Sequence, residues 1–168
     1  MTASDDILET TRCLCLAARR ASRTITREFD QALRAHGLRA TQFTLLSALN
    51  IAGPLAIGGL ADLLANDRTT ITRNLALVEK RGLASVRADK ADARSRVATI
   101  TPEGKALLQE AMPTWRKVQN ELTDAMGESA AAGLRRLAGG PCVTSPLDTP
   151  PTHQRKTPGV HSHAALLR

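Results

Sequence analysis

Aromatic residues are almost absent from this 168-residue chain, which has two phenylalanines, one tryptophan and no tyrosine. Apolar residues still make up 42% of the sequence, so the core has to be built mainly from leucine, alanine, isoleucine and valine. Alanine and leucine are strong helix formers, whereas strands favour aromatic and β-branched residues. The composition therefore favours packed helices over a sheet-rich sandwich, and the length suits one domain with a sizeable core.

Cysteines are also few, and they do not form the pattern of a disulfide-stabilised protein. The three are Cys13, Cys15 and Cys142. Chains with disulfide frameworks are usually shorter and richer in cysteine, so we expect a reducing, cytoplasmic location. Residues 1–6 are polar and acidic, which is unlike the start of a secretory signal peptide.

The chain lacks an uninterrupted apolar run of membrane-spanning length. Residues 43–61 carry no charge, but Gly53 and Pro54 and the Gly58-Gly59 pair interrupt them. Glycine and proline mark turns and helix ends, so this segment predicts a helix, a turn and a second helix. We therefore expect no membrane partner.

Acidic residues are in deficit, with 16 against 23 lysines and arginines, giving a net charge of +7 and a pI near 10.2. A basic excess of this size favours a polyanionic partner such as nucleic acid. The sequence shows no metal-ligand cluster, phosphate-binding glycine loop or nucleophile motif of recognisable spacing. His161 and His163, with Cys142 upstream, are interpreted as incidental. We expect no enzyme activity, no cofactor and no metal.

Several helical patterns are present. Residues 5–35 predict one long helix, because small and apolar residues recur every seven positions from Leu8 to Phe29, and Gly37 provides a left-handed exit. Further helices are predicted over 41–52, 58–65, 68–81, 102–126 and 128–138. Five of the eight prolines lie after residue 139, so residues 139–168 predict a disordered tail.

Strand-like segments are short and few. Residues 55–57 are predicted to be extended, and residues 83–88 and 97–101 alternate as strands around a charged segment, 89–96. Two helices joined by a short turn and followed by a β-hairpin make a winged helix-turn-helix. The predicted fold class is therefore mainly α with a small β-hairpin wing.

The second helix of this unit has two different faces. Ile71, Leu75 and Val78 fall on one side at helical spacing and should pack inward. The opposite face carries Thr69, Thr72, Arg73 and Ala76. Arginine can donate two hydrogen bonds to guanine, and threonine suits phosphates and thymine methyls, so this face is predicted to read the major groove.

The hairpin carries a basic cluster of Arg87, Lys90, Arg94 and Arg96. An exposed basic tip can enter a narrow minor groove. Residues 60–101 hold eight lysines and arginines against five acidic residues. Because this local excess is modest, the prediction depends on where the charges lie.

Residues 67–75 (DRTTITRNL) and 77–83 (LVEKRGL) resemble the recognition helix of the MarR family of bacterial transcriptional regulators. Residues 92–95 (DARS) and 100–104 (ITPEG) resemble that family's wing and the start of its next helix. The resemblance covers about residues 10–138.

The resemblance implies specific roles for residues and segments. It places Arg68, Thr69, Thr70, Thr72 and Arg73 in the major groove of double-stranded DNA and Arg94 in the minor groove, beside which Arg96 completes the basic wing. It implies a DNA-binding lobe over 38–101 and a helical dimerisation layer from residues 1–36 and 102–138. A homodimeric repressor on a pseudo-palindromic operator is expected, released by a small-molecule effector of unknown identity that binds a cleft between the layer and the lobe.

Two alternative functions remain open at this point. Some relatives sense oxidants through an N-terminal cysteine, so Cys15 and Cys13 could form a thiol sensor. Two residues apart on one helix they would point about 200° from each other, which makes a disulfide between them poor, and buried packing is the simpler interpretation. A sequence-blind nucleoid protein is the other alternative. Gly58 and Gly59 depart from the expected helix formers and either loosen the lobe or permit close packing.

Overall fold

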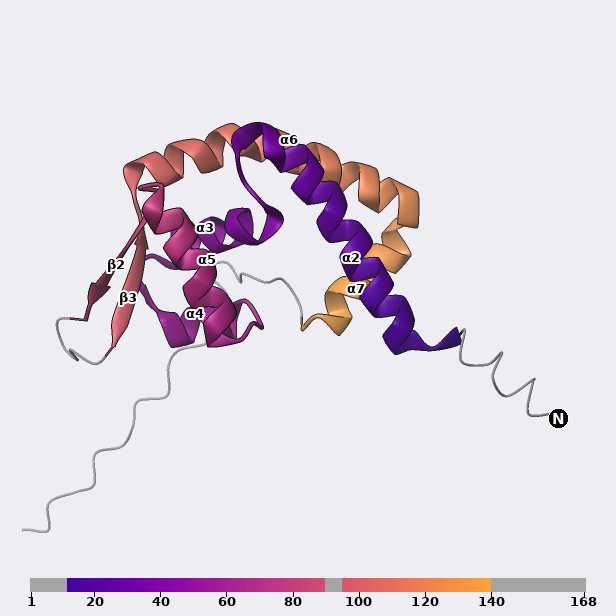
Figure 1. Ribbon diagram of the computed structural model, residues 1–168. Helices are drawn as coiled ribbons and strands as arrows, with labels where there is room; N and C mark the ends of the chain where they lie inside the picture. Colours follow the sequence, from indigo (N-terminus) through magenta and orange to yellow (C-terminus); the bar gives the residue numbers. More distant parts are fainter. Residues whose placement is uncertain (1–11, 90–94, 140–168) are drawn as a thin grey trace, which may run out of the picture.

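One long helix, α6 (Pro102–Met126), connects the two halves of the molecule. The computed structural model describes residues 12–89 and 95–139. Figure 1 shows α3, α4, α5 and the strands beneath one end of α6, and α2 and α7 beneath the other. Thr101 accepts a hydrogen bond from the Gly104 amide at 3.0 Å and Pro102 follows it, so α6 begins at a capped start where the sequence predicted it.

The N-terminal helix α2 runs over Leu14–Leu33 and ends in a 3-10 turn, Arg34–His36, before Gly37 at φ 65°. The predicted end is confirmed. The prediction of one continuous helix over 5–35 is wrong at Cys13, which is extended (φ −61°, ψ 118°). A seven-residue repeat does not show where a helix begins, and no side chain caps this start. Positions before residue 12 lie outside the described residues.

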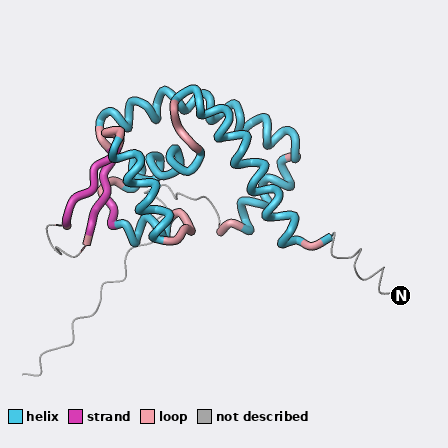
Figure 2. Tube along the Cα trace, in the orientation of Figure 1, coloured by secondary structure: helices cyan, strands magenta, loops and turns pink. Residues whose placement is uncertain are grey.

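The helices and strands predicted within the lobe over residues 38–101 are confirmed. Its helices are α3 (Ala40–Ala52), α4 (Ile57–Leu63) and α5 (Arg68–Lys80). Its strands are β1 (Leu55–Ala56), β2 (Ala84–Ala88) and β3 (Arg96–Ile100), all antiparallel in the order β1-β3-β2. Figure 2 shows this small sheet at the outer edge of the lobe. The fold class is therefore mainly α with a small wing.

The core is aliphatic, as the composition predicted, and draws on nearly every element. Leu33, Leu46, Leu60, Val78 and Ala98 are all fully buried, and each comes from a different helix or strand. Burying side chains from so many elements in one cluster makes the lobe and the end of α2 fold together.

All three aromatic residues form one stack. The Trp115 ring lies 6.2 Å from that of Phe29 and 6.0 Å from that of Phe43, between centroids. Such pairs contribute about 0.5–1.5 kcal/mol each beyond their buried area. Trp115 of α6 thus packs between α2 and α3 and holds them together.

The outer ends of α2 and α7 (Glu128–Leu137) expose large apolar side chains. Leu14 is 84% exposed and Leu137 89%, and Leu16 and Leu134 are also exposed. Within the described residues nothing covers them. Across those same ranges, no helix is both long enough and apolar enough to cross a membrane.

Candidate nucleic-acid interface

The recognition helix α5 begins at a strong cap. The Asp67 carboxylate accepts hydrogen bonds from the Thr70 amide at 2.8 Å and the Thr70 hydroxyl at 2.7 Å. The hydroxyl bond, followed by the amide bond, lowers the pKa of Asp67 below its usual value of 3.8. The Thr70 side chain is thereby engaged in capping, whereas the sequence predicted that it faces DNA.

The two faces of α5 differ as the spacing predicted. Ile71, Leu75 and Val78 are buried against the lobe. The opposite face is exposed over its whole length, and its residues are Arg68, Thr69, Thr72, Arg73 and Ala76. The Thr72 hydroxyl donates to the Arg68 carbonyl at 2.8 Å, which turns it toward its own helix. An exposed polar and cationic helix face is left beside the wing.

A hydrogen bond from the wing to a carboxylate of α5 helps to fix the two together. The Glu79 side chain accepts a hydrogen bond from the Val86 amide at 2.8 Å, joining the end of α5 to β2. Arg87 and Arg96 are exposed on the two strands, and Arg96 reaches the Val86 carbonyl at 3.4 Å. Lys90 and Arg94 lie outside the described residues.

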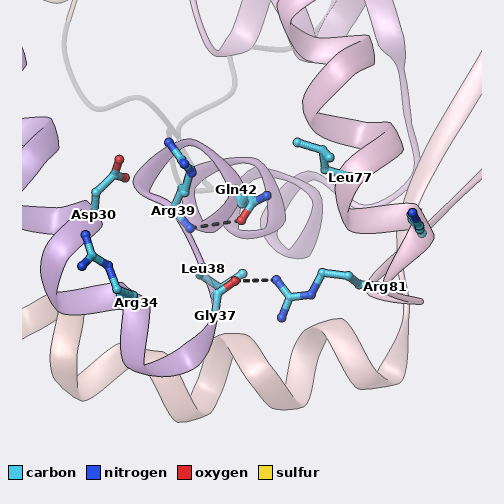
Figure 3. Close-up of a pocket in the computed structure, with 9 residues that line it drawn as sticks. Asp30, Arg34, Gly37, Leu38, Arg39, Gln42, Leu77 and Arg81 are labelled. Atoms are coloured by element: carbon cyan, nitrogen blue, oxygen red, sulfur yellow. Dashed lines mark hydrogen bonds between the residues drawn. The ribbon is translucent and has the colours of Figure 1, made fainter.

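A second feature is a basic cleft of about 580 Å³ between the end of α2, the start of α3 and the end of α5. Arg34, Arg39, Lys80 and Arg81 line it, opposite the one carboxylate of Asp30. Figure 3 shows Arg34 and Arg39 on one side of the cleft and Arg81 on the other. The family resemblance implied a cleft between the layer and the lobe, but no sequence pattern identified the residues of this one, because they come from two segments about forty positions apart.

Two hydrogen bonds organise this cleft. The Arg81 guanidinium donates to the Gly37 carbonyl at 2.6 Å, which joins the end of the recognition helix to the turn after α2 (Figure 3). Asp30 accepts from the Ala40 amide at 2.7 Å, so its charge is already engaged at the start of α3. The remaining cations leave the cleft electropositive.

His36 contributes to packing between the two halves. Its Nε2 lies 2.9 Å from the Thr114 hydroxyl, and its Nδ1 lies 3.4 Å from a Glu110 carboxylate oxygen. These contacts to α6 come from residues more than seventy positions away, so no local pattern could have predicted them.

The cysteines are placed differently from the buried-packing interpretation. Cys13 and Cys15 are both exposed, so packing within the single chain is wrong for them. Cys13 also precedes α2, so the two residues do not share a helix. The argument from 200° of helical rotation therefore does not apply. In residues 12–89 and 95–139 no group of three metal-ligating side chains comes together, and His161, His163 and Cys142 lie outside those ranges.

Comparisons with known proteins agree with this geometry. Residues 36–95 match the sequence model of the MarR family. The transcriptional regulator MosR of M. tuberculosis, solved in complex with DNA, is 37% identical with a TM-score of 0.65, and the match covers 76% of this chain and 96% of that one. A comparison with curated proteins finds no match.

More distant structures extend the same likeness. BpsR of Bordetella bronchiseptica, described as a case of regulation of DNA binding by 6-hydroxynicotinic acid, is 25% identical with a TM-score of 0.68, covering 75% of this chain and 90% of that one. E. coli MarR bound to operator DNA is 19% identical with a TM-score of 0.67, covering 83% and 97%, and shares the fold. With an exposed recognition helix, a wing and a relative 37% identical over nearly its whole length, this chain belongs to the MarR family of transcriptional regulators.

Proposed function

We propose that this chain binds a pseudo-palindromic DNA operator as a homodimer and represses transcription from it. The observation that carries the proposal is the exposed outer face of α5, whose inner face is buried. A helix presented in this way fits the major groove, and the wing beside it fits the adjacent minor groove.

The exposed residues take different roles in this proposal. Arg73 lies at the centre of the exposed face and is assigned to a base edge, where a bidentate contact discriminates by about 1–3 kcal/mol. Thr69 and Thr72 contact the major groove beside Arg73, and Thr70 acts by completing the Asp67 cap. Arg94 and Arg96 are the wing residues that contact the minor groove. Arg68 is considered separately below.

The homodimer is supported by the uncovered apolar ends of α2 and α7. Leu14 and Leu16 lie at the start of α2, and Leu134 and Leu137 lie on α7. Large apolar side chains left exposed in this way are typical of a protein interface. A second copy placed across them would give two recognition helices for two half-sites about one turn of B-DNA apart.

The direct test is a gel-shift series with genomic fragments that the protein retains. Because Arg73→Ala removes one contact from each half-site, at about 1–3 kcal/mol per contact, it should weaken specific binding at least about 30-fold and relax the preference at one base pair in each half-site. Arg116→Ala, which removes an exposed arginine from α6, is the matched control and should bind normally. Equal binding by wild type and Arg73→Ala would remove the basis of the proposal.

We infer further that the effector is a small organic anion bound in the basic cleft. Four cationic side chains face one engaged carboxylate there, and the volume of about 580 Å³ suits a small molecule. An anion pairing with Arg81 would compete with the Gly37 carbonyl and loosen the tie between α5 and the turn after α2. That competition would change the position of the recognition helix.

Aromatic carboxylates, with 6-hydroxynicotinic acid first, provide the probes for this inference. They should release DNA from wild type and act at least tenfold more weakly on Lys80→Ala, whereas the corresponding neutral amides should not release it. Release of DNA by acids and amides alike would show that charge does not select the effector.

Thiol sensing is a second candidate function, favoured by the exposure of Cys13 and Cys15 and by the extended backbone at Cys13. DNA affinity before and after peroxide, in wild type and Cys15→Ser, separates it from effector control. Unchanged affinity in wild type dismisses the sensor. A ratio near one between operator and unrelated DNA would instead favour a sequence-blind nucleoid protein.

A further inference from the structure

We infer that a recess between α5 and the wing binds one phosphate of the DNA backbone. Arg68 can lie in this recess because residue 58 is glycine and has no side chain. The inference rests on the proposed DNA-binding function. It assigns Arg68 to the phosphate backbone, whereas the family resemblance placed it in the major groove with the base-reading residues.

The recess has a volume of about 520 Å³ and is formed by α4, α5 and the start of β3. Arg68 and Arg96 line it with one carboxylate, Asp62, and the Thr72 side chain. Two guanidinium groups against one carboxylate leave a net positive charge. Guanidinium groups match phosphate oxygens in charge and in planar geometry. The chemistry of this recess therefore fits an oxyanion.

Gly58 determines where the Arg68 side chain lies. A Cβ at residue 58 would stand 2.8 Å from Nη2, 3.3 Å from Cζ and 3.5 Å from Nε of Arg68. Three guanidinium atoms thus lie against the bare backbone of α4. A glycine in a helix costs about 1 kcal/mol relative to alanine. Of the two explanations for the Gly58-Gly59 departure, close packing is the one that the geometry supports at Gly58.

The position of the recess indicates that the anion it binds is a phosphate of the DNA backbone. If α5 occupies the major groove and the wing occupies the adjacent minor groove, the sugar-phosphate strand separating those grooves must cross between them. The recess lies at that crossing, since α5 contributes Arg68 and Thr72 and the wing contributes Ser95 and Arg96. The Thr72 hydroxyl already donates to the Arg68 carbonyl, so the guanidinium groups supply the charge and the donors.

Arg68 therefore positions the protein on the DNA backbone and does not distinguish one base from another. Phosphate contacts strengthen binding equally on all sequences and steepen its dependence on salt, by about 0.9 in log–log slope for each phosphate on B-DNA. A dimer would lose about 1.8 of slope when both copies of Arg68 are displaced. Base preference at every operator position should stay unchanged.

Gly58→Ala tests this with little risk to the fold, because its Cβ meets only the end of a flexible side chain. We expect a salt slope shallower by about 1.8 with unchanged base preference, and the same for Arg68→Ala. Gly59→Ala is the matched control, since it makes the same change one residue along and its Cβ meets only the Leu55 side chain, at 3.3 Å. It should keep the wild-type slope.

A double-mutant cycle makes the test specific. If Gly58 acts only through Arg68, Gly58→Ala should have no further effect in the Arg68→Ala background. A wild-type slope for Gly58→Ala, an added loss in the double variant, or a changed base preference in Arg68→Ala would overturn the inference while leaving DNA binding intact. A wild-type protein that binds no DNA would overturn the proposed function as well.

Discussion

Close packing at Gly104 explains why the segment ITPEG (residues 100–104) ends in glycine. A Cβ at this position would lie 2.0 Å from the Leu83 carbonyl oxygen and 2.9 Å from Cγ1 of Ile100. The first turn of α6 therefore packs directly on the backbone entering β2. The sequence identified this glycine only through a family resemblance, and the structure supplies its physical reason.

Gly104→Ala should accordingly lower the free energy of unfolding by about 1–3 kcal/mol, because the added methyl meets backbone that cannot move aside. Urea unfolding followed by circular dichroism measures this. Gly133→Ala in α7 is the control, since its Cβ meets only Arg136 Nη2, at 3.9 Å, and alanine favours a helix. Comparable stability for wild type and Gly104→Ala would mean that this contact can relax.

Asp67 makes a prediction about pH at the same scale. Its pKa is lowered in the folded protein, so its contribution to stability is complete above the usual value of 3.8 and is lost as the pH falls through the folded value. Asp67→Asn keeps a capping oxygen but no charge. The stability difference between wild type and this variant should therefore shrink below about pH 4. A difference that is constant from pH 7 to pH 3 would contradict this.

At the scale of elements, local signals determined which boundaries could be predicted. Thr101 and Asp67 cap their helices, and Gly37 follows the end of α2, so these ends were predicted within two residues. The start of α2 has no cap, and there the sequence prediction was wrong. The exposed face of α5 follows from spacing alone. The basic cleft and the pairing of Gly58 with Arg68 depend on tertiary contacts that no local pattern contains.

The hydrogen bond between Glu79 of α5 and the Val86 amide of the wing can be tested by amide exchange. Glu79→Ala removes the acceptor for the Val86 amide, and that amide should exchange with deuterium about fivefold faster because one hydrogen bond is lost. Glu79→Gln retains an acceptor oxygen and should exchange at nearly the wild-type rate. Equal exchange in all three proteins would show that the wing is positioned by other contacts.

At the scale of the whole molecule, α6 joins an end with an exposed recognition helix to an end with exposed leucines (Figure 1). The aromatic stack around Trp115 fastens α2 to α3 across this connection. In the proposed homodimer, a change at the contact between the two copies would therefore reach the lobe through packed helices.

Leu16→Asp and Leu134→Asp should each shift the protein toward monomer in analytical ultracentrifugation and weaken operator binding at least tenfold, because a monomer contacts only one half-site. Ile51→Asp is the matched control. Ile51 is an exposed apolar residue at the end of α3 and belongs to neither α2 nor α7, so its replacement should leave the dimer intact. A wild-type protein that sediments as a monomer would exclude the homodimer.

Hydroxyl-radical footprinting of the protein on its selected operator shows whether two copies of α5 read one duplex. A homodimer on two half-sites should give two protected patches on one face of the duplex, centred about 10–10.5 base pairs apart. Both patches should weaken together in Arg73→Ala. Uniform protection along the fragment, or a single patch indifferent to Arg73, would contradict a dimer that reads DNA with α5.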